Sequence, residues 1–155
     1  MALVLAGLRR SSSALVSLRP VSYELRPIGV VESPLSDTAL APNQGDEGAP
    51  LAWLAIDPAY APALTDLAPG APLIVLTWLH QASRDVLRLH PRGDTTRPEA
   101  GVFSTRSPDR PNPIGMHVVE IVAVEGTRIQ VRDLEAIDGT PVIDLKPVLG
   151  DVGTR

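Results

Sequence analysis

The feature that most limits the possible folds is a series of short apolar segments separated by turns rich in Gly and Pro. The segments recur about every 8–12 residues, a spacing typical of antiparallel strands joined by short connections. The expected strands are residues 28–31, 51–56, 73–80, 86–90, 102–106, 116–124, 128–134 and 142–148. With 12 Gly and 16 Pro the chain is turn-rich. Residues 58–67 begin with Pro and precede a Pro-Gly pair, which predicts one short helix.

This pattern predicts an all-β fold, a small antiparallel β-barrel of about seven or eight strands with one short helix. We expect one barrel domain over residues 21–150 and a tail at residues 151–155. Residues 1–20 contain Arg and Ser but no acidic residue. This composition favours a disordered tail or a misassigned start, and secondarily an organellar transit peptide.

Composition and missing motifs exclude several classes of protein. The chain has no Cys, which removes disulfide scaffolds, zinc fingers and thiol catalysis. It contains no apolar run of the ~20 residues that a membrane-spanning helix needs. GxxxxGK[ST], GxGxxG and GxSxG motifs are absent, and the three His residues share no metal-ligand spacing. The net charge of −4 argues against nonspecific coating of nucleic acid. We therefore expect no metal and no membrane partner.

Arginine is concentrated in the middle of the sequence. Between Arg84 and Arg110 there are six Arg residues and four acidic residues, whereas Lys146 is the only Lys in the chain. The planar guanidinium group binds phosphates, carboxylates and base edges. This stretch is thus a candidate docking site for an anionic partner. The alternative is a solvated surface of salt bridges, which composition alone favours.

Two clusters of polar residues stand out. Residues 101–115 read GVFSTRSPDRPNPIG, a loop that its Pro residues make stiff while it carries several hydrogen-bonding groups. The alternative is a Pro-rich barrel corner with local salt bridges. The second cluster lies in residues 137–147, IDGTPVIDLKP, where a turn precedes a strand. Asp144 and Lys146 project to one face of that strand, and their alternative role is a surface ion pair.

These two clusters resemble the TsaA/TrmO-like family, whose members are also described as VirR-like or YaeB-like. The resemblance extends to LRPIGVVESP (25–34), PNQ (42–44) and TWLHQ (77–81), and it spans about residues 23–149. The family consists of S-adenosylmethionine-dependent tRNA methyltransferases built on a small β-barrel. The resemblance implies methylation of the N6 nitrogen of threonylcarbamoyladenosine beside the anticodon, with the tRNA anticodon loop as partner, a homodimeric assembly and a cytoplasmic location.

The resemblance also implies a set of site residues. S-adenosylmethionine is expected to contact Pro42, Asn43, Gln44, His80, Gln81, Arg106, Met116, Asp138, Gly139, Thr140 and Pro141. Asn43 stands where the family usually has Arg, and Val148 where it often has Tyr. By chemistry, Arg106 suits the methionyl carboxylate and Asp138 suits the positive sulfur.

Catalytic roles are expected for three further residues. Asp144 would accept the proton of the reacting amine, while Arg110 and Asn112 would orient the base. Two other functions remain open on sequence alone. One is a sensor that binds S-adenosylmethionine without catalysis, and the other is a methyltransferase that acts on a small non-tRNA substrate. The acidic net charge favours both alternatives slightly.

Overall fold

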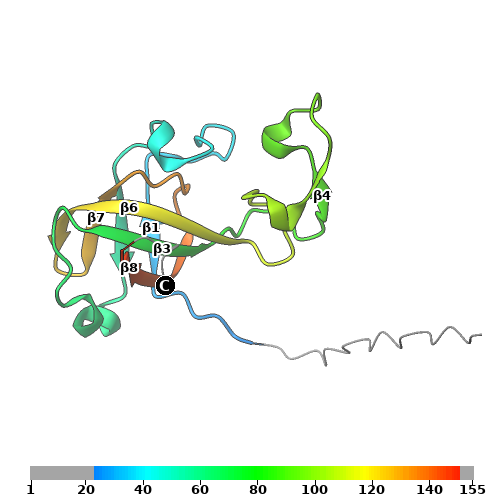
Figure 1. Ribbon diagram of the computed structural model, residues 1–155. Helices are drawn as coiled ribbons and strands as arrows, with labels where there is room; N and C mark the ends of the chain where they lie inside the picture. Colours follow the sequence, from blue (N-terminus) through cyan, green and yellow to red (C-terminus); the bar gives the residue numbers. More distant parts are fainter. Residues whose placement is uncertain (1–22, 151–155) are drawn as a thin grey trace, which may run out of the picture.

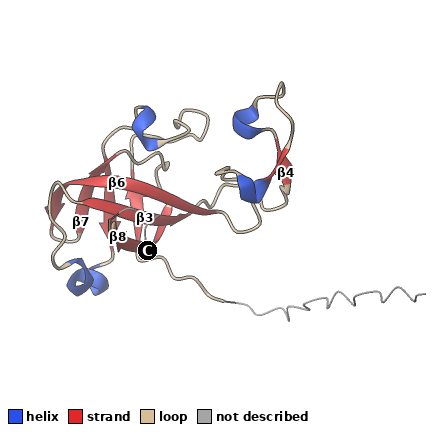
Figure 2. Cartoon of the chain, viewed as in Figure 1, coloured by secondary structure: helices blue, strands red, loops and turns tan. Residues whose placement is uncertain are grey.

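The computed structural model describes residues 23–150. The expectations for residues 1–20 and 151–155 lie outside the described residues. Within residues 23–150, six strands form a closed barrel (Figures 1 and 2). They are β1 (Gly29–Glu32), β2 (Ala52–Ile56), β3 (Pro72–Trp78), β6 (Ile114–Glu125), β7 (Arg128–Arg132) and β8 (Pro141–Pro147).

All neighbouring strands in the barrel run antiparallel, in the order β1-β2-β7-β6-β3-β8. The barrel closes where β1 meets β8, with Gly29 opposite Val142 and Val30 opposite Pro141. The fold class predicted from the sequence, an all-β antiparallel barrel, is confirmed. The barrel itself has six strands, because the segment predicted at residues 86–90 pairs outside the barrel and the segment predicted at residues 102–106 is not a strand.

Alternating side chains of the barrel strands build the core. In β2, for example, Ala52, Leu54 and Ile56 are buried while the residues between them are half-buried. The residues that fill the interior are mostly Val, Ile and Leu, whose branched side chains suit the inner face of a sheet. They include Val31, Leu54, Leu73, Val75, Val119, Ile121, Ile129, Val131, Leu134 and Val142. A period-two pattern with one buried face is what fixes the register of such strands.

Residues 80–113 form an arm that projects from one end of the barrel (Figure 1). It contains the two-stranded pair of β4 (Arg88–Leu89) and β5 (Ala100–Gly101). The strand predicted at residues 102–106 is instead a 3-10 turn, η4 (Val102–Ser104). The hydroxyls of Ser104 and Thr105 donate to the carbonyls three residues earlier, at 2.7 and 2.9 Å. Such local bonds compete with strand pairing, and a sequence pattern of apolar residues does not reveal them.

The short helix predicted at residues 58–67 is present as the 3-10 helix η2 (Pro58–Leu64). Asp57 caps it by accepting a hydrogen bond from the Ala59 N–H at 2.8 Å. Pro62 lies inside the helix, where its ring prevents a regular α-helical ladder. Two more 3-10 turns are η1 (Gly45–Glu47) and η3 (Pro91–Gly93). None of the helices in the described part of the chain has the length and apolarity to cross a membrane.

Candidate functional site

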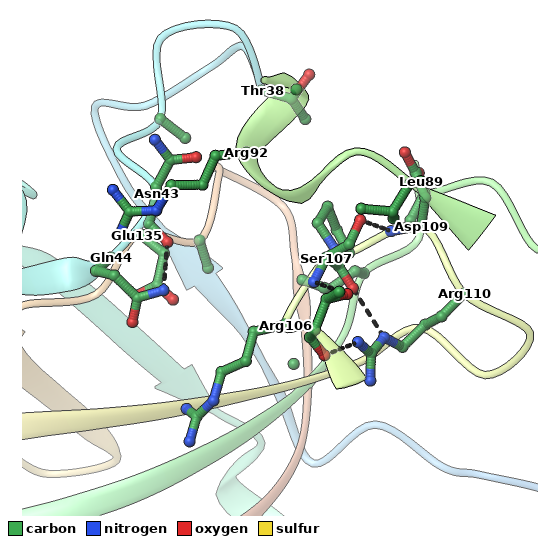
Figure 3. A pocket seen from close by; sticks show the side chains of 18 of the residues that line it. Thr38, Asn43, Gln44, Leu89, Arg92, Arg106, Ser107, Asp109, Arg110 and Glu135 are labelled. Carbon is green, nitrogen blue, oxygen red and sulfur yellow. Dashed lines mark hydrogen bonds between the residues drawn. The ribbon is translucent and has the colours of Figure 1, made fainter. Parts of the chain in front are cut away.

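A large open pocket lies where the arm meets the end of the barrel. Its volume is about 1210 Å³, more than enough for a nucleoside-sized ligand. Segments far apart in sequence line it: the loop before β2, the residues after β3, parts of the arm, the loop before β6 with the start of that strand, and the segment after β7. The predicted residues that the pocket brings together are Pro42, Asn43, Gln44, His80, Gln81, Arg106, Arg110, Met116 and Thr140. Figure 3 labels Asn43, Gln44, Arg106 and Arg110 among them.

The first wall is the loop of residues 36–50, which carries Asn43 and Gln44. The Gln44 amide nitrogen donates to the Asn43 carbonyl at 2.8 Å. The loop is anchored at Gly45, because a Cβ at that position would overlap the backbone carbonyl of Asp133. Only Gly permits this approach of two backbones. The contact therefore fixes the distance between this loop and the segment that follows β7.

The end of β3 forms the second wall. The pairing of β3 with β8 shifts register between Leu76 and Thr77, and such a bulge turns the following residues out of the sheet. His80 and Gln81 follow in an exposed turn. Ser83 joins this turn to the loop before β6. Its N–H donates to Asp109 Oδ1 at 2.8 Å, and its carbonyl accepts from the Arg110 N–H at 2.9 Å.

Arg106 and Arg110, only four residues apart, have different environments. Arg110 donates to three backbone carbonyls, those of Ser107 at 2.8 Å, Thr105 at 2.6 Å and Val102 at 3.3 Å (Figure 3). The Arg106 guanidinium has no hydrogen-bond or ion-pair partner among residues 23–150. Arg106 is thus a cation available to a ligand, and Arg110 shapes the loop that presents it.

Replacing Arg110 with Ala is expected to loosen this loop without unfolding the barrel. Hydrogen bonds from a charged donor contribute about 1.5–3 kcal/mol each, and the variant loses all of them at once. Hydrogen exchange at residues 102–107 should accelerate by about tenfold or more, with barrel strands unchanged. Arg97→Ala is the matched control, because Arg97 forms only an exposed ion pair with Asp94 at 3.2 Å. Unchanged exchange in Arg110→Ala would contradict this role.

The turn before β8 mainly holds the barrel together. Asp138 accepts from the Ser33 N–H at 3.0 Å through Oδ1, and its own N–H donates to the Leu35 carbonyl at 2.6 Å. Gly139 adopts a φ of +75° and its N–H donates to the Val31 carbonyl at 2.8 Å. Thr140, which is buried, reaches the pocket wall. Asp138, Gly139 and Pro141 are not among the residues that line the pocket.

Asp144 and Asn112 also lie outside the pocket lining. Asp144 forms an ion pair with Lys146 at 2.7 Å, which is the alternative role that the sequence left open for this pair. Asn112 is exposed, and its backbone carbonyl accepts from the Ile114 N–H at 2.8 Å.

Sequence reasoning missed two residues at the base of the pocket, His117 and Glu135. His117 lies on β6 and is only 5% exposed, and its Nε2 is 2.9 Å from the Thr77 hydroxyl. Its Nδ1 is 2.9 Å from Glu135 Oε1. The available signal was the alternation of β6, which turns His117 inward together with Gly115 and Val119. A His among inward-facing apolar positions is unusual, whereas nothing around Glu135 marks it as part of a site.

The arm carries six Arg residues, and three of them form ion pairs. Arg88 pairs with Glu99 at 3.3 Å and Arg92 with Glu47 at 3.2 Å. Hydrogen bonds from the side chain and backbone N–H of Thr96 lower the pKa of Asp94. Asp94 consequently remains a charged partner for Arg97. In residues 23–150 no three His, Asp or Glu side chains gather as a metal site would require.

The fold and the pocket together define a class of protein, a small closed β-barrel with a polar ligand pocket at one end. A family model described as the tRNA-methyltransferase O N-terminal domain matches residues 30–153. The chain belongs to this family, and the resemblance inferred from its motifs is confirmed.

Individual relatives agree with this assignment. An S-adenosyl-L-methionine-binding protein of Archaeoglobus fulgidus is 51% identical over 122 residues, which are 79% of this chain and 86% of the relative. A probable S-adenosyl-L-methionine-binding protein VirR of Rhizobium radiobacter is 40% identical over 77% of this chain and 67% of the relative.

Two crystal structures of TrmO share the fold. One matches with a TM-score of 0.70 and 29% identity over 87% of this chain. The other, from Pseudomonas aeruginosa, matches with a TM-score of 0.66 and 27% identity over 87% of this chain. The chain spans 61% and 60% of the lengths of these two proteins.

Proposed function

We propose that this protein is an S-adenosylmethionine-dependent methyltransferase that methylates N6 of threonylcarbamoyladenosine next to the tRNA anticodon. The observation that carries the proposal is the unpaired Arg106 guanidinium on the wall of a pocket that also contains a carboxylate, Glu135. Family membership and the names of its relatives support the same cofactor. This function places the protein with tRNA in the cytoplasm.

The pocket residues fit S-adenosylmethionine chemically. The ligand has a carboxylate, an ammonium group, a positive sulfur, a ribose and an adenine. Arg106 offers a planar fork for the carboxylate. The amides of Asn43, Gln44 and Gln81 offer donors and acceptors for the adenine and ribose, and Met116 offers an apolar surface. Pro42 and Thr140 also line the pocket, and the hydrogen bonds of Asp138 and Gly139 fix the turn that carries Thr140.

When bound, S-adenosylmethionine supplies an electrophilic methyl group for an in-line displacement by nitrogen. Such a reaction depends on alignment more than on acid or base strength. The stiff loop around Arg106, held by Arg110, is suited to that task because its geometry is set before the ligand arrives. His80 is exposed and lines the pocket, where it is available to the RNA substrate.

The proton of the acceptor nitrogen requires a base within ~3 Å of it or a path to water. Asp144 does not line the pocket of its own chain, whereas Asp109 and Glu135 do. The pocket is open to solvent, so water can also receive the proton. We therefore propose that the protein accelerates the reaction by aligning the methyl donor with the acceptor nitrogen, without Asp144 as a base. Arg110 contributes by holding the loop that carries Arg106.

The proposed homodimer is supported by an apolar stripe on the barrel surface. Ile114, Met116 and Val118 alternate along β6 and point outward, with exposures of 44%, 47% and 57%. The stripe begins at the pocket, since Met116 and Ile114 also line it. A second copy on this face would cover apolar surface and complete the pocket wall. Sedimentation analysis at micromolar concentration tests this assembly, and a monomer would contradict it.

The function is tested by incubating the protein with labelled S-adenosylmethionine and tRNA from a strain that lacks this methyl group. Label in tRNA, located at threonylcarbamoyladenosine by nucleoside mass spectrometry, is the expected result. Tight binding of S-adenosylmethionine without transfer would instead support the sensor. Transfer to small metabolites but not to tRNA would support the non-tRNA methyltransferase. Absence of binding would contradict all three.

A further inference from the structure

The base of the pocket contains a chain of three side chains that the proposed function has not used. Thr77, His117 and Glu135 come from β3, β6 and the segment after β7, and they are linked by two contacts of 2.9 Å. Gly115 makes room for them, since a Cβ there would lie 2.6 Å from His117 Nε2 and even closer to the Thr77 hydroxyl. A larger residue at position 115 would therefore displace the side chains of Thr77 and His117.

His117 Nδ1 is fully buried and lacks an aligned hydrogen bond, although Glu135 Oε1 lies 2.9 Å away. The oxygen is close to the ring nitrogen but off the direction of its N–H bond. A carboxylate only accepts, so the contact requires a proton on Nδ1. A small rotation of the carboxylate would align this bond. His117 thus holds the Glu135 side chain against the pocket base.

The Glu135 carboxylate has no Lys or Arg partner among residues 23–150, and its side chain is 23% exposed. The other acid on the pocket wall, Asp109, is already bonded to the Ser83 N–H. Glu135 and Arg106 both line the pocket (Figure 3). A partly buried carboxylate without a cation is costly, and a positively charged ligand group would offset that cost.

We propose that Glu135 is the counter-charge for the sulfonium of S-adenosylmethionine and that His117 is its positioning residue. This inference rests on the proposed function. In methyl transfer the S–CH3 bond breaks and an N–CH3 bond forms, the electron pair stays on sulfur, and the acceptor proton leaves to water. Sulfur becomes neutral, so Glu135 attracts the substrate sulfonium but not the thioether of S-adenosylhomocysteine. The pocket consequently binds S-adenosylmethionine more tightly than S-adenosylhomocysteine.

The test compares the affinities of both compounds by isothermal titration calorimetry in the wild type and in Glu135→Gln. The variant keeps the shape of the side chain and removes its charge. We expect the affinity for S-adenosylmethionine to fall about tenfold or more and that for S-adenosylhomocysteine to change less than about twofold. Glu120→Gln is the matched control, because this carboxylate pairs with Arg132 at 3.6 Å on the barrel surface and both residues lie outside the pocket lining. It should leave both affinities unchanged.

Equal loss for both compounds would overturn the inference, because it would place Glu135 on the ammonium group that they share. Unchanged binding of both would also overturn it. If the wild type binds neither compound, the proposed function fails instead, so the two failures are distinguishable.

Two substitutions of His117 test its positioning role. His117→Asn keeps a donor near the position of Nδ1, whereas His117→Gln moves the amide toward the position of Nε2 and Thr77. We expect His117→Asn to retain the preference for S-adenosylmethionine and His117→Gln to lose most of it. The ratio of the two affinities does not depend on the fraction of folded protein, so a loss of stability does not obscure the result. Equal ratios in the two variants would overturn this role.

Discussion

Gly45→Ala is expected to lower the melting temperature by about 10 °C, corresponding to about 3 kcal/mol. The added Cβ would overlap the backbone carbonyl of Asp133, and a backbone atom cannot rotate away as a side chain does. The loop of residues 36–50 would have to move off the segment that carries Glu135. Ligand affinity should therefore fall together with stability. Differential scanning calorimetry with and without S-adenosylmethionine measures both effects.

Gly101→Ala is the control for this experiment. Gly101 has an ordinary φ of −64° and no atom within 4 Å of an added Cβ, so the substitution should leave the melting temperature nearly unchanged. If Gly45→Ala melts like the control, the close approach of the loop to Asp133 does not anchor the pocket wall.

Arg106→Lys is expected to weaken the binding of S-adenosylmethionine by about 10- to 100-fold. Lys keeps the positive charge but cannot form the paired hydrogen bonds of the guanidinium, a difference of about 1–3 kcal/mol. Stability should not change, because Arg106 is exposed and bonds to no described residue. Isothermal titration calorimetry gives the affinity, and thermal melting checks the fold.

Arg97→Lys provides a matched control in the same arm, since Arg97 lies outside the pocket and forms an exposed pair with Asp94. It should bind the cofactor like the wild type. Normal binding by Arg106→Lys would mean that the guanidinium does not hold the ligand, and that the loop is a structural corner of the barrel.

The strands of the barrel were predictable because the apolar pattern that defines each strand is local and periodic. The alternation in β2 and the apolar run of β3 indicate which faces are buried, and the turns that join strands contain Gly or Pro. The arm was less predictable, because its strands are only two residues long and its Ser104 and Thr105 hydroxyls replace strand pairing with local bonds. The number of strands in the barrel depends on which strands pair with one another. The sequence pattern predicts where strands lie but not how they pair.

The motifs identified most of the residues that line the pocket. They did not show which of these residues are available to a ligand and which hold the walls in place. Both Arg106 and Arg110 were expected to contact a ligand, and the sequence pattern does not reveal that the partners of Arg110 are backbone carbonyls of its own loop. Asp138 looked like a ligand contact, yet its partner is the Ser33 N–H, 105 residues away in the chain. His117 and Glu135 meet only because β6 and the segment after β7 converge in space. Contacts of this kind exist only in the folded protein.

The seam between β1 and β8 links the completion of folding to the formation of the pocket. These strands are separated by more than 100 residues, and contacts over such distances generally form late because closing a long loop costs entropy. The seam's hydrogen bonds include Val31 N–H to the Thr140 carbonyl, and Thr140 also lines the pocket. A partly folded chain with an open seam therefore has no complete pocket. A ligand bound there selects the closed barrel and slows its opening.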